Sequence, residues 1–135
     1  MPWTLDLLPE RFALIRRPAG ATIPSWVWRG PLQAVVRTPI ETSILTLEAA
    51  VPEDVPASRG WRALRVRGPL PLDLIGVLAE LTALLAQAGV SVFAVSTYDT
   101  DYLLVQAHAL PHAVAALHAA GHVVHILPPL SEPGP

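Results

Sequence analysis

Strand-like and helix-like residue patterns alternate between residues 62 and 127, and this alternation leaves few folds open to the chain. Residues 62–67 alternate between polar and apolar side chains, as a half-buried strand does. Apolar residues then recur at helical spacing over residues 72–88, and Gly89 ends this helix because glycine readily adopts the left-handed conformation that closes one. The pattern therefore begins with a strand and a helix.

Two further strands, a second helix and a last strand complete the predicted order of elements. Residues 90–95 and 102–105 are apolar and rich in β-branched and aromatic side chains, which is typical of covered strands. Pro111 opens a helix that runs to Ala120, and residues 122–127 form the last strand. The order βαββαβ predicts the α+β class and a ferredoxin-like sandwich, in which two helices cover one face of an antiparallel sheet.

The first half of the chain resembles a shortened copy of the second. Residues 38–45 align with residues 97–104 as a polar turn and an apolar exit strand, and residues 12–18 align with residues 62–68. Only residues 23–28 lie where the copy needs a helix, and they are too few to nucleate one alone. We therefore expect two tandem units and a tail: a degenerate N-terminal unit at 1–59, a complete unit at 60–127 and a flexible tail at 128–135.

Composition excludes several classes of partner and chemistry. The chain has 135 residues, 52% of them hydrophobic, with a net charge of −2, and all nine basic residues are scattered arginines. Because no basic stripe could follow a phosphate backbone, we expect no nucleic-acid partner. The absence of cysteine removes thiolate chemistry and fits a reducing compartment. We find neither a signal-peptide pattern nor a long uninterrupted apolar stretch, and so expect a cytoplasmic protein that does not cross a membrane.

The turn between the two central strands is unusually polar. Ser96, Thr97, Asp99, Thr100 and Asp101 supply three hydroxyls and two carboxylates within six residues, more than a hairpin needs. One interpretation is that these side chains meet a ligand. The alternative is local capping, in which Asp and Thr side chains bind their own backbone, and the residue types alone leave both open.

A second ligand-binding element is predicted before the first helix. The loop Gly68-Pro69-Leu70-Pro71 precedes a helix start, where unpaired N–H groups, from Leu72 onward, and the helix dipole favour an anion. Asp99 or Asp101 would accept an ammonium or guanidinium group. An amino acid carries both charges, so the sequence predicts a zwitterion that bridges the helix start and the turn.

Three segments resemble the small tandem ACT-domain family related to the CASTOR arginine sensors. They are Val92-Phe93-Ala94-Val95-Ser96-Thr97-Tyr98-Asp99-Thr100-Asp101-Tyr102-Leu103-Leu104-Val105, which looks like the family's hallmark, Leu7-Leu8-Pro9-Glu10-Arg11-Phe12-Ala13, and Gly60-Trp61-Arg62-Ala63-Leu64. The resemblance covers the chain to about Ile126. It implies regulatory binding of a small molecule, usually an amino acid, between ACT units and without catalysis.

The resemblance also implies which residues bind. It places Thr97, Tyr98 and Asp101 opposite the loop formed by Gly68, Pro69 and Leu70. The first copy departs from the pattern through its missing helix and through Glu41, so no equivalent second site is expected there. The complete set of predicted ligand-binding residues is Gly68, Pro69, Leu70, Leu72, Ser96, Thr97, Tyr98, Asp99 and Asp101.

The predicted helix at 72–88 has a wide apolar surface. Its strongly polar side chains, Asp73, Glu80 and Gln87, recur every seven residues and form one narrow stripe. The excess apolar surface favours a homodimer or packing between units. The alternative is that alanine and leucine are present there simply because they are good helix formers.

Other chemistries find little support in the residues. The histidines of the last third, such as His108 and His112, straddle helix ends instead of sharing one helix face, so no metal site or cofactor is predicted. The segment Arg16-Arg17-Pro18-Ala19-Gly20 only weakly imitates a phosphate loop, and the chain contains no asparagine. No strand-serine-helix elbow predicts a catalytic triad.

The sequence therefore predicts an amino-acid sensor with no catalytic residues. We expect a homodimer, and the regulated enzyme or protein partner is not identified by the residues. The alternatives are an interaction or oligomerisation module without a ligand, and an acyl-phosphate-type hydrolase on the same fold.

Overall fold

The computed structural model describes residues 2–129, and the chain divides into two units. Unit 2 is Glu10–Trp61, and unit 1 combines the residues before Glu10 with those from Arg62 onward. Strand β1 (Thr4–Pro18) contributes its first residues to unit 1 and the remainder to unit 2. Residues 130–135 of the predicted flexible tail lie outside the described residues.

Unit 1 has the predicted ferredoxin-like arrangement of sheet and helices. Its strands are the start of β1, the end of β4 (Ser58–Val66), β5 (Phe93–Ser96), β6 (Asp101–Gln106) and β7 (Val123–Ile126). They lie in the order β7-β1-β4-β6-β5. Strands β5 and β6 pair antiparallel with Ser96 opposite Asp101, whereas β1 and β7 pair parallel with Thr4 opposite Val123. The first residues of β1 thus add a fifth strand to the four predicted ones.

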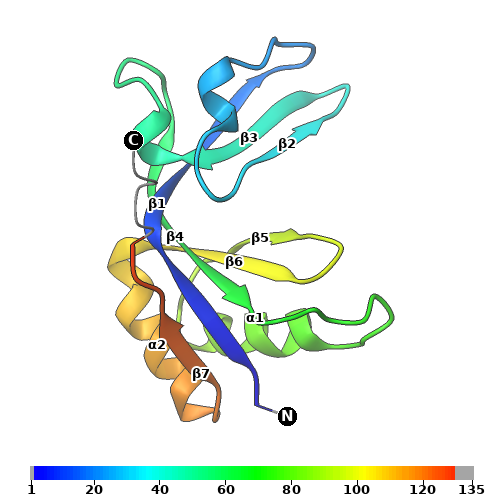
Figure 1. Ribbon diagram of the computed structural model, residues 1–135, viewed down its shortest axis with the longest axis vertical. Coiled ribbons are helices and arrows are strands. Elements are labelled where there is room, and N and C mark those ends of the chain that lie inside the picture. Colours follow the sequence, from blue (N-terminus) through cyan, green and yellow to red (C-terminus); the bar gives the residue numbers. More distant parts are fainter. Residues whose placement is uncertain (1, 130–135) are drawn as a thin grey trace, which may run out of the picture. The chain divides into compact units, whose positions relative to one another are not determined.

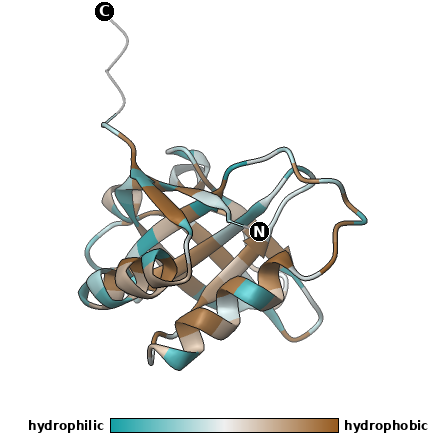
Figure 2. Cartoon of the chain, turned by 90° about the horizontal axis from the view of Figure 1, so that it is seen from below, coloured by the Kyte–Doolittle hydropathy of each residue, from teal (hydrophilic) through white to brown (hydrophobic). Residues whose placement is uncertain are grey.

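Two helices cover one face of this sheet (Figure 1). They are α1 (Val77–Gln87) and α2 (Leu110–Ala119), the latter entered through the 3-10 turn η3 (Ala107–Ala109). Leu81 and Leu85 of α1 and Leu117 of α2 are fully buried and pack with Leu5, Leu64 and Leu103 of the sheet. Figure 2 shows hydrophobic colouring where the helices meet the strands and hydrophilic positions on their outer sides. The predicted helical apolar spacing is therefore the core-facing side of α1.

Helix α1 begins later than the predicted start at residue 72. The Leu74 N–H donates to the Pro71 oxygen at 3.1 Å, which forms a turn, and Gly76 has a φ of 90°. A right-handed helix cannot continue through a residue with positive φ, so it starts at Val77. Asp73 therefore lies in the loop, and the predicted polar stripe on the helix is reduced to Glu80 and Gln87.

The first turn of α1 is held by a polar network. The Trp3 indole N–H donates to Glu80 at 3.2 Å, and the Trp3 backbone N–H donates to the His122 Nδ1 at 2.9 Å. The buried His122 Nε2 lies 3.5 Å from the other Glu80 oxygen. These contacts connect Trp3, which precedes β1, and His122, which precedes β7, with Glu80 of α1.

A buried carboxylate lies in the sheet of unit 1. Asp6 on β1 accepts hydrogen bonds from Arg67, with the shortest distance 2.6 Å, and from Arg65 at 3.4 Å. The hydrogen bond from Arg67, together with the charges of both arginines, holds the pKa of Asp6 below its ordinary value although burial opposes this. The negative charge of Asp6 is therefore compensated by Arg65 and Arg67.

Unit 2 is a small antiparallel sheet without an α-helix among its described residues. Strand β3 (Glu41–Leu47) pairs with β2 (Ala34–Arg37) on one side and with the second half of β1 on the other. Ala13, Ile15, Val27, Ile44 and Val51 form its core. Two 3-10 turns, η1 (Ser25–Trp28) and η2 (Glu48–Ala50), replace the helices, and the Thr46 hydroxyl donates to the Val27 oxygen at 2.7 Å. The short segment predicted at 23–28 is thus η1.

Neither α-helix in the described residues combines the length and the apolar content needed to cross a membrane.

Candidate functional site

The polar turn between β5 and β6 is closed by its own side chains. The Thr97 N–H donates to the Thr100 oxygen at 2.7 Å, and the Thr100 N–H donates back to the Thr97 hydroxyl oxygen at 3.2 Å. This is the local capping that the sequence left open as an alternative. For Thr97 the structure supports that interpretation.

The loop before α1 packs directly on this turn. The Leu70 N–H donates to the Asp99 oxygen at 2.7 Å, and the Thr100 hydroxyl donates to the Val66 oxygen at 2.5 Å. A Cβ atom on Gly68 would lie 3.0 Å from the Asp99 oxygen, so the approach of the two backbones favours glycine. The turn and the loop that the sequence placed opposite each other are therefore in contact.

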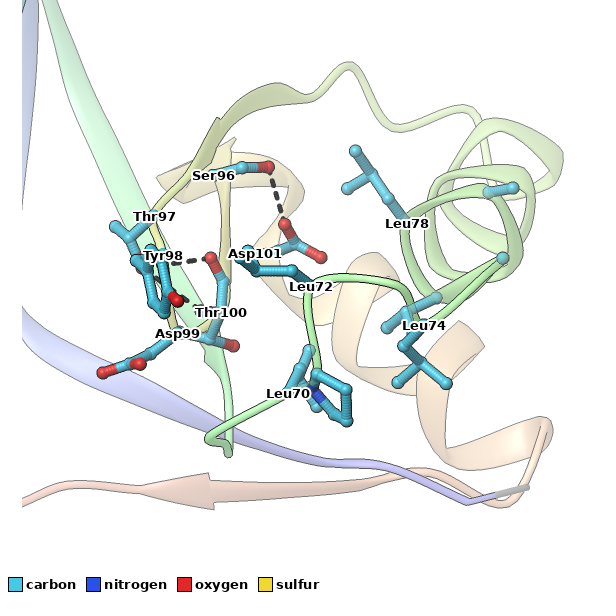
Figure 3. Close-up of a pocket in the computed structure, with 14 residues that line it drawn as sticks. Leu70, Leu72, Leu74, Leu78, Ser96, Thr97, Tyr98, Asp99, Thr100 and Asp101 are labelled. Carbon is cyan, nitrogen blue, oxygen red and sulfur yellow. Dashed lines mark hydrogen bonds between the residues drawn. The ribbon is translucent and has the colours of Figure 1, made fainter.

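A pocket of about 340 Å³ opens between this turn, the loop and the start of α1. Its lining residues are Leu70, Pro71, Leu72, Leu74, Gly76, Val77, Leu78, Ala79, Ser96, Thr97, Tyr98, Asp99, Thr100 and Asp101. Figure 3 shows the Asp101 carboxylate directed into the space that faces Leu78 on α1. Asp101 accepts a hydrogen bond from the Ser96 hydroxyl at 2.6 Å, which fixes its orientation.

The first turn of α1 supplies the opposite polar wall. The first intrahelical bond runs from the Glu80 N–H to the Gly76 oxygen, so the N–H groups of Val77, Leu78 and Ala79 precede the helical ladder. Gly76 makes no side-chain cap. A carboxylate and a helix start thus face one pocket, an arrangement that can hold a positive and a negative group of one ligand.

The structure brings together most of the predicted ligand-binding residues. Leu70, Leu72, Ser96, Thr97, Tyr98, Asp99 and Asp101 line the pocket, whereas Gly68 and Pro69 do not. Tyr98 is 79% exposed at the rim. Leu72 contributes a side chain instead of a helix-start amide, because the helix begins at Val77.

The sequence analysis missed several pocket residues. Leu74, Gly76, Leu78 and Ala79 were assigned to a continuous helix, and Thr100 was noted in the turn but not included in the set. The glycine at position 76 was the available signal, since a glycine inside an apolar helical pattern often marks a helix end.

Neither His118 nor His125 lines the pocket, and each contacts a residue elsewhere in unit 1. The His118 Nε2 accepts the Val124 N–H at 3.4 Å, and the His125 Nδ1 lies 3.7 Å from Asp6. Within residues 2–129, no three His, Asp or Glu side chains gather as metal ligands do.

One family model and several solved structures match this chain. Residues 57–119 match the family model of the ACT domain. Protein Atu0741 from Agobacterium tumefaciens is 30% identical over 95% of this chain and 96% of its own, with a TM-score of 0.88. No curated protein matches.

More distant structures share the fold alone. Protein VC0802 from Vibrio cholerae is 17% identical, with a TM-score of 0.70 over 87% of this chain and 88% of its own. The ligand-free regulatory subunit of aspartate kinase from Thermus thermophilus is 15% identical, with a TM-score of 0.59 over 87% of this chain and 94% of its own.

Proposed function

The chain belongs to the same family as Atu0741 and its residues 57–119 match the ACT domain, and from that premise we propose that it is a non-catalytic regulatory protein that binds an amino acid. The ligand occupies the pocket between the turn 97–101 and the start of α1. The likeness in fold to a regulatory subunit of aspartate kinase agrees with this role.

One observation carries the proposal: Asp101 and residues 77–79, whose N–H groups precede the helical ladder of α1, line the same pocket. The ammonium group of an amino acid binds the Asp101 carboxylate, and its carboxylate accepts from the N–H groups of Val77, Leu78 and Ala79. Hydrogen bonds to charged groups contribute about 1.5–3 kcal/mol each when sheltered. Two such contacts select a zwitterion over a simple amine or a simple acid.

The proposal includes the organisation expected from the resemblance to the tandem ACT proteins related to the CASTOR sensors. We assign a degenerate ACT-like copy to the N-terminal part, predicted as residues 1–59, and the complete ACT domain to residues 60–127 together with the first residues of β1, which pair with β7. The Thr38 N–H donates to the Glu41 oxygen at 3.0 Å and the Glu41 N–H donates to the Thr38 hydroxyl oxygen at 3.0 Å, which repeats the geometry of the turn at Thr97. The protein acts as a homodimer in the cytoplasm on a partner still to be found.

The test is a panel of the twenty amino acids in a thermal-shift assay, with calorimetry on each hit. A ligand that binds only the folded state raises the apparent stability. Asp101→Asn should weaken binding about tenfold or more, because it removes the charge that meets the ammonium group. Asp73→Asn is the matched control, since it removes the same charge from an exposed residue that does not line the pocket.

A flat panel at millimolar concentrations would overturn the proposal and favour an interaction module without a ligand. Equal loss of binding in both variants would show that net charge, and not the position of Asp101, governs affinity.

A further inference from the structure

The loop before α1 exposes more aliphatic surface than a solvated loop needs. Leu72, Leu74 and Ile75 are 67%, 41% and 94% exposed. Figure 2 shows this loop, at the right of the view, as mostly hydrophobic. Large exposed apolar side chains that cluster in one segment point to a contact that is absent from the free protein.

Two of these three side chains belong to the pocket. Leu72 and Leu74 line it together with Leu70 and Leu78, whereas Ile75 does not. In Figure 3 Leu74 and Leu78 lie on the α1 side of the space, Ser96 lies on the side of the turn, and Leu72 is drawn beside Asp101. The two charges of a zwitterion thus bind at Asp101 on one wall and at the start of α1 on the other, and the leucines supply an aliphatic side for whatever extends from it.

The charged groups of the pocket leave no partner for a charged ligand side chain on the aliphatic side. The ionisable lining residues are Tyr98, Asp99 and Asp101, so no cation among them meets an acidic side chain. In Figure 3 the Asp99 carboxylate points away from the leucines, so a basic side chain lying among them would not reach it. A charged group placed against leucine would be desolvated without compensation.

Resting on the proposed function, we infer that the ligand is an α-amino acid with an aliphatic side chain, of the valine, leucine and isoleucine class, and that Leu72 and Leu74 determine this specificity. The volume of about 340 Å³ lies at the small end of ligand pockets, which span about 300–1,000 Å³. Each methylene that the ligand buries against the leucines strengthens binding, since burial contributes about 0.8 kcal/mol per group.

The experiment measures affinities for a graded ligand series by calorimetry: alanine, valine, leucine, isoleucine, arginine and glutamate. Leucine should bind at least about tenfold more tightly than alanine, because it buries up to three more carbon atoms. Leu74→Asn should reduce this leucine-to-alanine ratio to about threefold or less while leaving alanine affinity nearly unchanged. A purely structural role of Leu74 would lower the thermal stability and leave the ratio intact.

Ile75→Asn is the matched control, because it removes an equally apolar side chain from the same loop but outside the pocket. It should leave the ratio unchanged. An equal loss of the ratio in Ile75→Asn would overturn the assignment of specificity to the pocket leucines. Measuring the oligomeric state of both variants shows whether the loop instead contacts a second copy of the chain, which would also overturn it.

The failures of the two proposals are distinguishable. Tighter binding of arginine or glutamate than of leucine, lost in Asp101→Asn, would overturn the aliphatic class and leave the amino-acid sensor standing. Absence of binding by every amino acid would overturn the proposed function itself.

Discussion

The two hairpin turns of the molecule, 38–41 in unit 2 and 97–100 in unit 1, share one geometry but differ in what they present. In each, a threonine N–H donates to the oxygen three residues later, and the threonine hydroxyl oxygen accepts a backbone N–H. The pair of residues that flanks the turn is Arg37 and Thr42 in unit 2 but Ser96 and Asp101 in unit 1. The carboxylate that faces a pocket in unit 1 therefore has a hydroxyl in its place in unit 2.

The difference extends to the residue's surroundings. Thr42 is fully buried and donates to the Pro18 oxygen at 3.0 Å, whereas Asp101 is partly exposed beside the start of α1. Unit 2 has the four-residue turn η1 where unit 1 has an eleven-residue helix. The two units thus share the geometry of the turn, and the elements that face it determine whether a pocket forms beside it.

Exchanging the flanking residues tests this comparison with the largest expected effect. Thr42→Asp should destabilise the protein by about 2–3 kcal/mol, because it buries a carboxylate and removes the hydroxyl that donates to the Pro18 oxygen. Its cross-strand neighbours Arg17 and Arg37 offset only part of this cost. The reciprocal Asp101→Thr should cost about 1 kcal/mol or less, since the position is partly exposed. Urea unfolding of both variants at neutral pH provides the measurement, and similar losses would refute the asymmetry.

The second largest expected effect is a difference between the two units in how acid changes their stability. Asp6 of unit 1 is buried with a lowered pKa, whereas the Arg16–Glu41 pair of unit 2 is exposed at 3.9 Å. A lowered folded pKa contributes stability that is present above the unfolded pKa and is lost as the pH falls through the folded pKa.

Asp6→Asn should therefore lower the unfolding free energy by about 1.5–3 kcal/mol at pH 7 and by progressively less below about pH 4. Glu41→Gln is the control and should change it by less than about 0.5 kcal/mol. The measurement is denaturant unfolding at several pH values. A constant difference between the native protein and Asp6→Asn across this range would contradict the assignment.

The shared geometry itself predicts equal effects in the two turns. Thr97→Val and Thr38→Val keep the side-chain shape but remove the acceptor of the turn N–H, and each should cost about 0.5–1.5 kcal/mol. Thermal unfolding of the two variants should give losses that agree within about 0.5 kcal/mol. If Thr97→Val also abolished ligand binding while the fold was kept, Thr97 would belong to the site and not to the scaffold.

The smallest expected effect concerns the orientation of Asp101. Ser96→Ala removes the hydrogen bond to that carboxylate and should weaken ligand binding about two- to tenfold, with little change in stability. Arg37→Ala is the matched change in unit 2 and should leave affinity unaltered. Calorimetry with the best ligand of the panel decides between them, and an unchanged affinity in Ser96→Ala would show that Asp101 needs no positioning.

The sequence predicted the sandwich fold because periodicity and the punctuating residues agreed along 62–127. The end of α1 before Gly89 and the start of α2 at Pro111 each lie within one residue of the predicted boundary. The alignment of residues 38–45 with residues 97–104 also matches the register of both hairpins, in which Thr42 and Asp101 occupy equivalent positions.

Two features were beyond such local reasoning. The start of α1 was missed because leucine-rich loops and leucine-rich helices have the same composition, and only the positive φ of Gly76 separates them. The contribution of residues 4–9 to the sheet of unit 1 depends on pairing with strands far along the chain, which no short sequence window records. Of the residues that line the pocket, the sequence singled out those of the polar turn and the neighbouring loop, but not Leu74 and Leu78.

The position of β1 has a consequence for the order in which the chain folds. Thr4 pairs with Val123, so the sheet of unit 1 is incomplete until almost the whole described chain has been synthesised, whereas the contacts of unit 2 lie within residues 10–61. Closing so long a loop carries an entropic cost that local pairing avoids, and it slows folding. Unit 2 therefore forms first, and the sheet of unit 1 is completed only when β7 pairs with β1.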